Sequence, residues 1–334
     1  MTKRVLVLGA QGVLGAFVAR ELTAHGFAVV RAGRRNEVAA DFRFIDLDDS
    51  ESLPQAFRDC DLVVSTVPHS NLLAERTVLE HGGTLLNVAS LLAVQCEQME
   101  QQVREPRGLV AVHGGMGPGL ANLNAADLLR RHQNADTVEI GTTLSAAGTS
   151  GVAGVKWVYG VFTQGTHHCT RLVHLPKPFG ARRCFRLTLA KEGWLRGVGG
   201  SFEQHLLLCL SERWLQLPLI ALNRLGLNSW VSAAPFPLRH KGIPDHLTTE
   251  PVCHWAAVYR DGRCLEARTV EAQGDYRTTA IAAGVFAEAL LFKRGSNNLP
   301  SGVKGVHEIF PFAALKPEFE SRGLKFTEQA SIER

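Results

Sequence analysis

Three glycines stand at a three-residue spacing near the start of the chain. Gly9, Gly12 and Gly15 directly follow the apolar run 4–8, and a helical pattern begins between them. In this context Gly9 lets the chain reverse, and Gly15 lets the helix lie close to the strand. Free amides and the positive end of the helix attract phosphate, so we predict a dinucleotide site; the alternative is a strand-to-helix turn without a ligand. The residues assigned to this turn of the site are Gly9, Gln11, Gly12, Val13 and Gly15.

The residues after the second expected strand indicate which dinucleotide is favoured. An NAD site has Asp or Glu there, about 20 residues beyond the glycines, to accept hydrogen bonds from the ribose hydroxyls. This chain has Gly33, Arg34 and Arg35 instead. Because a guanidinium holds a 2′-phosphate that a carboxylate would repel, Arg34 and Arg35 predict NADP(H) as the cofactor. We expect Asp46, at the end of the third strand, to border the adenine; alternatively it caps the following turn.

Small and hydroxylated residues occupy the ends of the later strands, where a flat cofactor can lie close. The carboxyl ends of parallel strands line the crevice for the nicotinamide, and here they fall at 65–69, 87–90 and 113–119. For His69 and His113, proton transfer and a structural or capping role both stay open. The residues assigned to the cofactor at these ends are Thr66, Val67, Pro68 and Ala89.

Alternating elements must position these residues. The first 115 residues alternate short apolar runs with helical patterns, which indicates βαβ crossovers and a parallel sheet buried on both faces. We therefore predict an α/β fold with a Rossmann-type doubly wound parallel sheet and right-handed crossovers. Its expected strands are 4–8, 27–32, 42–47, 62–67, 84–88 and 109–113.

The pattern changes after Gly119 and indicates an inserted α+β domain for substrate binding and dimerisation. The leucine-rich stretch 206–227 is interrupted by polar residues and Pro218, so it is expected to form two packed amphipathic helices near 202–217 and not a membrane span. A helical pattern at 276–293 is placed back against the first domain. The predicted domains are 1–119, 120–272 and 273–334. Elements expected in the second are a helix at 120–132, strands at 137–145, 171–175, 184–190, 255–259 and 264–270, and a glycine-studded helix at 155–162.

Composition and charge limit the partners. With 45% hydrophobic and 20% charged residues the chain is typical of folded proteins, and a net charge of +4 is too small to make nucleic acid the main partner. The segment 151–200 holds eight basic residues and one acid, which gives +7 there and leaves −3 for the rest. Such a segment attracts an anionic substrate or an acidic lipid surface, or is a solvated face. The candidates for holding substrate carboxylates are Arg171, Arg182, Arg183 and Arg186.

The cysteines indicate the compartment and the absence of a metal. Seven cysteines, an odd number without a CxxC pair, favour a reduced, cytoplasmic setting. No metal is predicted, because His167, His168 and Cys169 have no second ligand cluster at a zinc-like spacing. The first apolar run has five residues and is too short for the core of a signal peptide.

Several segments occur in an order that covers most of the chain. They are the glycine turn, the strand ends at 65–68 and 87–90, the turn 114–120 followed by Asn122, and the helix 278–291 followed by Gly302, Val303 and Pro311. Together they resemble the saccharopine dehydrogenase family of NADP-binding reductases. The resemblance implies a nicotinamide domain with an inserted substrate domain, and reduction of an imine formed between an amine and a carbonyl acid, or the reverse reaction. The residues it assigns to the cofactor are Gly9, Gln11, Gly12, Gly15, Arg34 and Thr66.

The chain departs from the lysine-pathway members at one position of its proline turn. Gly117 stands where they usually have Asp, and 334 residues is short for them, which argues against saccharopine itself as the substrate. Lys156 and Tyr159 lie about one helical turn apart and are the candidate catalytic residues; packing of Tyr159 beside a solvated Lys156 is the alternative.

We therefore predict an NADP(H)-dependent oxidoreductase that transfers hydride to an imine or carbonyl of a small, anionic substrate and acts as a homodimer. Two other function classes stay open. One is an NADP(H)-binding, redox-responsive regulator without turnover, because no clear acid/base pair is evident. The other is a family member that contacts a membrane surface through the basic segment and the leucine-rich stretch.

Overall fold

The chain divides into two compact units. The computed structural model describes residues 2–35, 37–68, 71–89, 91–145, 166–187, 194–212, 221, 225, 249–296 and 298–329, and their side chains except those of 166–169. The first unit comprises Met1–Leu123, Glu192–Gly197 and Thr279–Arg322, and the second comprises Asn124–Lys191, Val198–Thr278 and Gly323–Arg334. Each unit contains its own sheet, so each is described separately below.

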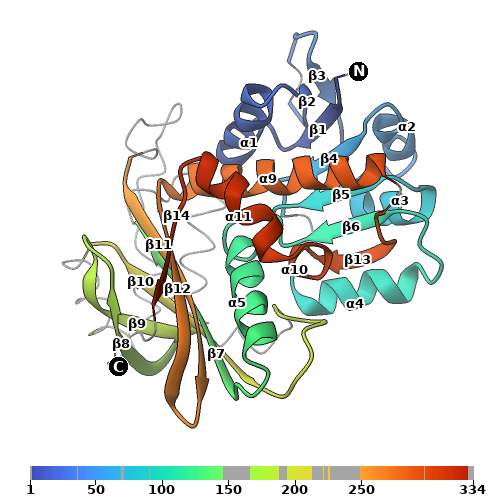
Figure 1. The fold of residues 1–334 in the computed structure, drawn as a ribbon. Helices are drawn as coiled ribbons and strands as arrows, with labels where there is room; N and C mark the ends of the chain where they lie inside the picture. Colours follow the sequence, from blue (N-terminus) through green and yellow to red (C-terminus); the bar gives the residue numbers. More distant parts are fainter. Residues whose placement is uncertain are drawn as a thin grey trace. The chain divides into compact units, whose positions relative to one another are not determined.

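A seven-stranded parallel sheet forms the centre of the first unit. Its strands follow the order β13-β6-β5-β4-β1-β2-β3, which Figure 1 traces from β13 (red) to β3 (blue). The predicted Rossmann-type doubly wound sheet is confirmed. The strands are β1 (Arg4–Leu8), β2 (Ala28–Gly33), β3 (Phe42–Phe44), β4 (Leu62–Ser65), β5 (Thr84–Asn87), β6 (Leu109–Val112) and β13 (Gly302–Gly305).

Strand β13 was not among the six strands that the sequence predicts for this sheet. It has four residues, Gly302–Gly305, and it pairs in parallel with β6 at the edge of the sheet. Two of its four residues are glycine, so it lacks the β-branched run by which the other strands are recognised. Pairing with β6 therefore determines its conformation.

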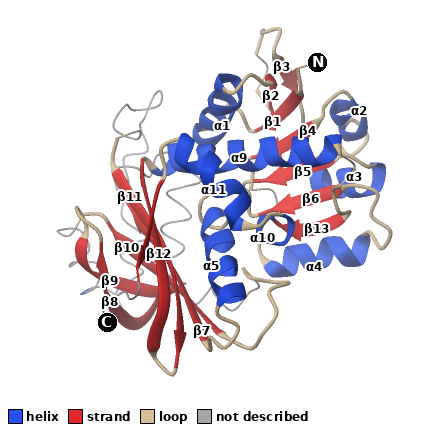
Figure 2. Cartoon of the chain, viewed as in Figure 1, coloured by secondary structure: helices blue, strands red, loops and turns tan. Residues whose placement is uncertain are grey.

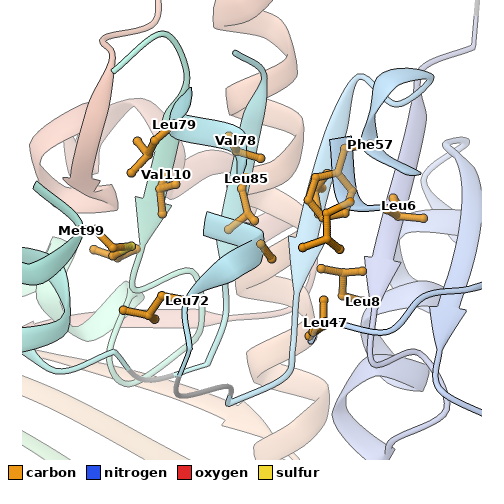
Figure 3. Packing of buried hydrophobic residues seen from close by; sticks show 14 of the residues in the cluster. Leu6, Leu8, Leu47, Phe57, Leu72, Val78, Leu79, Leu85, Met99 and Val110 are labelled. Atoms are coloured by element: carbon orange, nitrogen blue, oxygen red, sulfur yellow. The ribbon is translucent and has the colours of Figure 1, made fainter. Parts of the chain in front are cut away.

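The helices of the first unit cover a sheet that is apolar on both faces. Leu6 and Leu8 of β1 belong to a core with side chains of α2, α3 and α4 (Figure 3), while Val5 and Val7, which alternate with them along the strand, are equally buried. Burial on both faces explains why these strands read as continuous apolar runs. The helices are α1 (Val13–Ala24), α2 (Leu53–Arg58), α3 (Leu73–His81), α4 (Ala93–Gln102), α9 (Asp275–Gly295), α10 (Val306–Ile309) and α11 (Phe312–Ser321).

The second unit is built on a mixed sheet with α5 (Leu120–Arg131). Its order is β14-β12-β11-β7-β10-β9-β8; β7 and β10 are parallel, and the other neighbours are antiparallel. Figure 2 shows the long strands β11 and β12 of this sheet, of which β11 is the neighbour of β7. The predicted strands at 137–145, 171–175, 255–259 and 264–270 are present, and the one predicted at 184–190 is present as far as Leu187, beyond which 188–190 lie outside the described residues. The strands are β7 (Thr137–Leu144), β8 (Thr166–Leu175), β9 (Gly180–Leu187), β10 (Glu203–Leu210), β11 (Pro251–Arg260), β12 (Arg263–Gln273) and β14 (Lys325–Gln329).

The prediction of helices near 202–217 is wrong where the structure describes this stretch. Residues Glu203–Leu210 form strand β10, which lies between β7 and β9. Its last five residues, 206–210, are all buried. A strand buried on both faces presents an unbroken apolar run, which periodicity alone does not distinguish from a buried helix. The glycine-studded helix predicted at 155–162 lies outside the described residues.

The end of the chain differs from the predicted domain boundary. Helix α9 confirms the predicted helix at 276–293, but the segment after α11 belongs to the second unit, where β14 pairs with β12. Arg268 of β12 supports this pairing through Glu328 of β14, at 3.1 Å. Among the helices that the structure describes, none is both long and apolar enough to cross a bilayer.

Candidate functional site

The glycine turn between β1 and α1 is held by backbone hydrogen bonds. The amides of Gly9 and Ala10 both donate to the carbonyl of Ala32, at 3.0 and 3.1 Å, and the Gly12 amide donates to Gly9 at 2.8 Å. Gly9 has φ +80°, and a Cβ there would lie 2.6 Å from Val67 Cγ2. A Cβ at Gly15 would collide with the carbonyl of Gly9. The turn therefore requires glycine at positions 9 and 15.

The first turn of α1 offers amides to an anion. The first bond of the helix runs from the Ala16 amide to the Gly12 carbonyl at 2.9 Å, so the amides of residues 13–15 have no acceptor within the helix. In the described part of the chain, no side chain caps α1, and its first turn contains no acid. The positive end of the helix is thus available to phosphate, and no carboxylate competes there.

Gln11 connects the glycine turn to the loop after β2. Its Nε2 donates to the carbonyl of Arg35 at 2.8 Å, and its Oε1 accepts from the Arg35 amide at 3.2 Å. A Cβ at Gly33 would collide with this amide side chain. Gln11 therefore holds the backbone of the arginine loop in register with the turn, a role that the sequence did not predict.

The loop after β2 presents positive charge. Arg34 and Arg35 are exposed. The acids that follow them, Glu37 and Asp41, both bind Arg31, at 2.6 and 2.7 Å, and these hydrogen bonds hold the pKa of Asp41 below its ordinary value. Arg31 thus engages both acids, and the three arginines 31, 34 and 35 exceed the two acids by one positive charge.

The end of β4 lies against the glycine turn. Thr66 Oγ1 donates to the carbonyl of Leu8 at 2.8 Å, and the side chains of Thr66 and Val67 fill the space over Gly9. Pro68, next along the chain, is exposed, and Ala89 after β5 is buried. Thr66 and Val67 therefore lie at the glycine turn.

Asp46 supports the turn that follows β3. Its Oδ1 accepts the amide of Asp48 at 3.1 Å, which caps the turn after β3. Asn71 supports the same turn by donating to the carbonyl of Leu47, at 3.2 Å, and to Asp48 at 2.8 Å. This contact gives Asp46 a structural function whether or not a ligand lies beside it.

The turn after β6 is built from close backbone contacts. A Cβ at Gly119 would collide with the carbonyl of Gly115, and Gly119 has φ +146°. The Gly119 amide donates to Asn122 Oδ1 at 2.8 Å, and Asn122 Nδ2 donates to the carbonyl of Trp194 at 2.5 Å. The Gly117–Pro118 peptide bond is cis. The turn thus anchors the segment around Trp194 within the first unit.

His113, directly after β6, lies beside a second histidine. Its ring is 6.4 Å from that of His307 and 6.5 Å from Trp194, measured between centroids. His307 Nε2 donates to the carbonyl of Arg196 at 2.9 Å. Burial, together with His307, lowers the pKa of His113 to about 4. These contacts make His113 a neutral, buried residue, and they involve two residues, His307 and Trp194, that sequence reasoning did not single out.

The arginines of the basic segment mostly have partners within the second unit. Arg171 forms an ion pair with the buried Glu139, and Arg186 binds Glu203 at 2.6 Å. Arg182 is buried and donates to the carbonyls of Phe179 and Ser211. These three side chains support the sheet. Arg183 is exposed and reaches Thr170 Oγ1 at 3.5 Å.

Other predicted residues fall outside this description. Lys156, Tyr159 and His69 lie outside the described residues, as does the segment 146–165 around the first two. Across the described ranges, no group of three or more His, Cys, Asp or Glu side chains is arranged to hold a metal.

Comparisons with known proteins agree with this architecture. The model of the NAD dependent epimerase/dehydratase family matches residues 5–100, which span β1 to α4. The chain is similar to the solved structure of saccharopine dehydrogenase (L-Glu forming) from Saccharomyces cerevisiae, with 13% identity, a TM-score of 0.62, and coverage of 98% of this chain and 100% of that one. A search of curated proteins finds no match.

A second solved structure has the same arrangement. It is a meso-dapdh mutant with DAP from Clostridium tetani E88, with 10% identity, a TM-score of 0.51, and coverage of 94% of this chain and 96% of that one. At these identities the likeness shows the fold. The resemblance to saccharopine dehydrogenase is thus confirmed at the level of a Rossmann-type unit joined to a second, mixed-sheet unit.

Proposed function

We propose that the chain is an NADP(H)-dependent oxidoreductase of the saccharopine dehydrogenase-like type. It would transfer hydride to an imine or carbonyl of a small, anionic substrate. The observation that carries the proposal is the uncapped first turn of α1, held by Gln11 in register with the loop of Arg34 and Arg35. The free amides of this turn are complementary to the diphosphate of a dinucleotide, and the two arginine side chains are complementary to a 2′-phosphate.

The residues of the first unit divide the work of binding. Gly9, Gly12 and Gly15 open the turn to the diphosphate, and Val13 supplies one of the free amides. Arg34 and Arg35 would hold the 2′-phosphate. Asp46 would border the adenine, and Thr66, Val67, Pro68 and Ala89 would line the nicotinamide side, because they follow the carboxyl ends of β4 and β5. These assignments rest on the position of each residue in the sheet.

The bound cofactor would supply the hydride chemistry. The protein must then orient the substrate, exclude water and supply a proton if a carbonyl is reduced. Lys156 and Tyr159 stay predictions for the proton donor.

A panel of amines with oxoacids, assayed with NADPH, tests for turnover. NADPH binding without turnover of any pair would favour the regulator. The predicted homodimer and the membrane contact stay predictions, which sedimentation and liposome flotation can test.

Changing Arg34→Glu tests the choice of cofactor. The carboxylate would repel the 2′-phosphate, so we expect NADPH to bind at least about tenfold more weakly and NADH to bind at least as well as before. Calorimetric titration with both cofactors, on the full chain, measures this. Arg263→Glu, an exposed arginine of β12, is the matched control. An equal loss for both cofactors would remove the assignment of Arg34 to the 2′-phosphate.

A further inference from the structure

The chain between β2 and β3 carries acids beside its arginines. Arg31 lies within β2, Arg34 and Arg35 follow the end of this strand, and Glu37 and Asp41 come next. Sequence spacing allows either acid to pair with any of the three arginines. In the structure both acids bind Arg31: its Nη2 donates to Glu37 Oε1 at 2.6 Å and to Asp41 Oδ1 at 3.1 Å, and its Nε donates to Asp41 Oδ2 at 2.7 Å. One guanidinium group therefore holds both carboxylates.

Backbone pairing fixes Asp41 beside Arg31. Strands β2 and β3 are parallel with Arg31 opposite Phe42, and the Arg31 amide donates to the carbonyl of Asp41 at 2.7 Å. Asp41 therefore stands at the amino end of β3. Arg31 itself lies two residues before Gly33, the last residue of β2, which corresponds to about 7 Å along the strand. Asp41 is thus tied, through backbone and side chain, to a residue inside the sheet, whereas the ligand crevice lies beyond the carboxyl edge of the sheet.

Arg34 and Arg35 are left without a carboxylate partner. Both side chains are exposed, and none of the carboxylates that the structure describes forms an ion pair with either of them. Gln11 contacts only the backbone of Arg35, through its amide and its carbonyl. The acids of this loop are therefore both on one arginine, and the guanidinium groups of the other two arginines are available to an anion.

Loss of Arg31 would change this distribution of charge. Glu37 stands two residues after Arg35, so a released Glu37 carboxylate has the Arg34 and Arg35 guanidinium groups as its nearest free cations along the chain. A guanidinium that holds a carboxylate through paired, charge-assisted hydrogen bonds cannot hold a phosphate in the same way at the same time. A released acid also repels a 2′-phosphate through its charge. Both effects act on a cofactor with a 2′-phosphate and not on one with a 2′-hydroxyl.

We propose that Arg31 determines cofactor specificity as a positioning residue: by holding Glu37 and Asp41, it keeps Arg34 and Arg35 available to the 2′-phosphate of NADP(H). This inference rests on the proposed function, because it requires the cofactor to bind at the glycine turn. Arg31 acts through the other two arginines and not by contact with the cofactor. Its hydrogen bonds with Asp41 and Glu37 raise the pKa of Arg31, and the same bonds with Arg31 lower the pKa of Asp41, so the ion pair persists at neutral pH.

Arg31→Met tests this role by titration calorimetry of the full chain with NADPH and with NADH. We expect NADPH to bind at least about tenfold more weakly, and NADH to bind within about twofold of the wild type. The ratio of the two affinities is decisive, because general damage to the loop or to the fold weakens both cofactors alike. Arg58→Met, at an exposed position of α2, removes the same charge without releasing Glu37 or Asp41, and it should retain the wild-type ratio.

Two further variants separate the release of the acids from the loss of a charge. Adding Glu37→Gln and Asp41→Asn to Arg31→Met removes the released acids and should return the affinity for NADPH to within about threefold of the wild type. Arg31→Lys keeps the charge but lacks the planar fork that holds two carboxylates, so its affinity for NADPH should lie between those of the wild type and Arg31→Met. The lysine variant also provides the measurement if the methionine variant does not fold.

Three results would overturn the inference: equal weakening of both cofactors in Arg31→Met, an unchanged affinity for NADPH in that variant, or no recovery when the two acids are also replaced. Each of them leaves NADPH binding by the wild type, and its selective loss in Arg34→Glu, as support for the proposed function. A wild-type chain that binds no NADPH, or that binds NADH more tightly, would instead remove the proposed function and this inference with it.

Discussion

At the scale of the residue, His113 combines burial with a strained backbone. It has φ +64°, a conformation that costs a non-glycine residue about 1–2 kcal/mol. It is 3% exposed, and its Nδ1 has no hydrogen-bond partner within the described residues. The position of His113 directly after β6 is compatible with a ligand site at the carboxyl ends of the strands. Its ring contacts with His307 and Trp194 are those of a residue in a packed core. The pH dependence of stability measures the energetic consequence of this burial.

Folding should become less favourable in acid because of this histidine. The pKa of folded His113, about 4, lies below the ordinary 6.5, so the unfolded chain takes up a proton that the folded chain excludes. Stability is complete above pH 6.5 and falls by roughly 3 kcal/mol as the pH drops toward 4. His254, whose pKa burial lowers to about 3, acts in the same direction.

The His113→Asn variant isolates the contribution of His113. Asn tolerates the left-handed backbone and does not titrate, so the free energy of unfolding should depend less steeply on pH between 6.5 and 4. Urea denaturation at several pH values measures this slope. His25→Asn, at an exposed position, is the matched control for the exchange of a histidine for asparagine. An unchanged slope in His113→Asn would show that His113 is not the buried neutral histidine described above.

At the scale of the element, the close packing of α1 on β1 depends on Gly15. A methyl group there would collide with backbone atoms of Gly9 and Ala10. Backbone atoms cannot move aside as the end of a flexible side chain can. The helix must then shift away from the turn that holds the amides in place. The two consequences, lower stability and a displaced anion site, should appear together.

Gly15→Ala should therefore lower the free energy of unfolding by about 1–3 kcal/mol, the usual cost of overpacking. It should also weaken NADPH and NADH to the same extent, because the diphosphate is common to both. Thermal unfolding and calorimetry are the measurements. Gly199→Ala is the control, because nothing lies within 4 Å of a Cβ there. Wild-type melting and wild-type affinity in Gly15→Ala would contradict the packing argument.

At the scale of the whole molecule, each unit depends on segments that are distant in sequence. Strand β14 completes the second sheet by pairing with β12, and the buried Arg268 binds Asn124 at 2.9 Å, Asp127 at 3.1 Å and Glu328 at 3.1 Å. The end of the chain therefore stabilises a sheet whose first strand begins at Thr137.

Truncation after Gly323 should destabilise the second unit selectively. It removes the partner strand of β12 and one of the carboxylates of Arg268, and we expect a loss of roughly 1–3 kcal/mol. Hydrogen exchange should accelerate in β11 and β12, while β1 and β4 of the first unit retain their protection. Glu328→Gln in the full chain separates the ion pair from the strand. Equal acceleration in both units would mean that they do not unfold independently.

Local pattern determined much of the first unit. The first six strands, α1 and α9 follow from apolar runs and helical periodicity, because each buries its own side chains in a way that neighbouring residues reveal. The glycine spacing identified the turn, because the absence of a Cβ permits this tight bend in any chain. The charge at Arg34 and Arg35 was evident from the sequence, although the ion pairs of Arg31 with Glu37 and Asp41 were not.

Pairing between distant segments decided the rest. The run Leu206–Leu210 fits a buried helix as well as a strand, and only its neighbours β7 and β9 make it a strand. Strands β13 and β14 carry little apolar pattern and take their conformation from the sheet edges that they join. Likewise, Arg171 meets Glu139 and His113 meets His307 only after folding. Such contacts depend on which segments become neighbours in the sheets, and sequence spacing does not encode this.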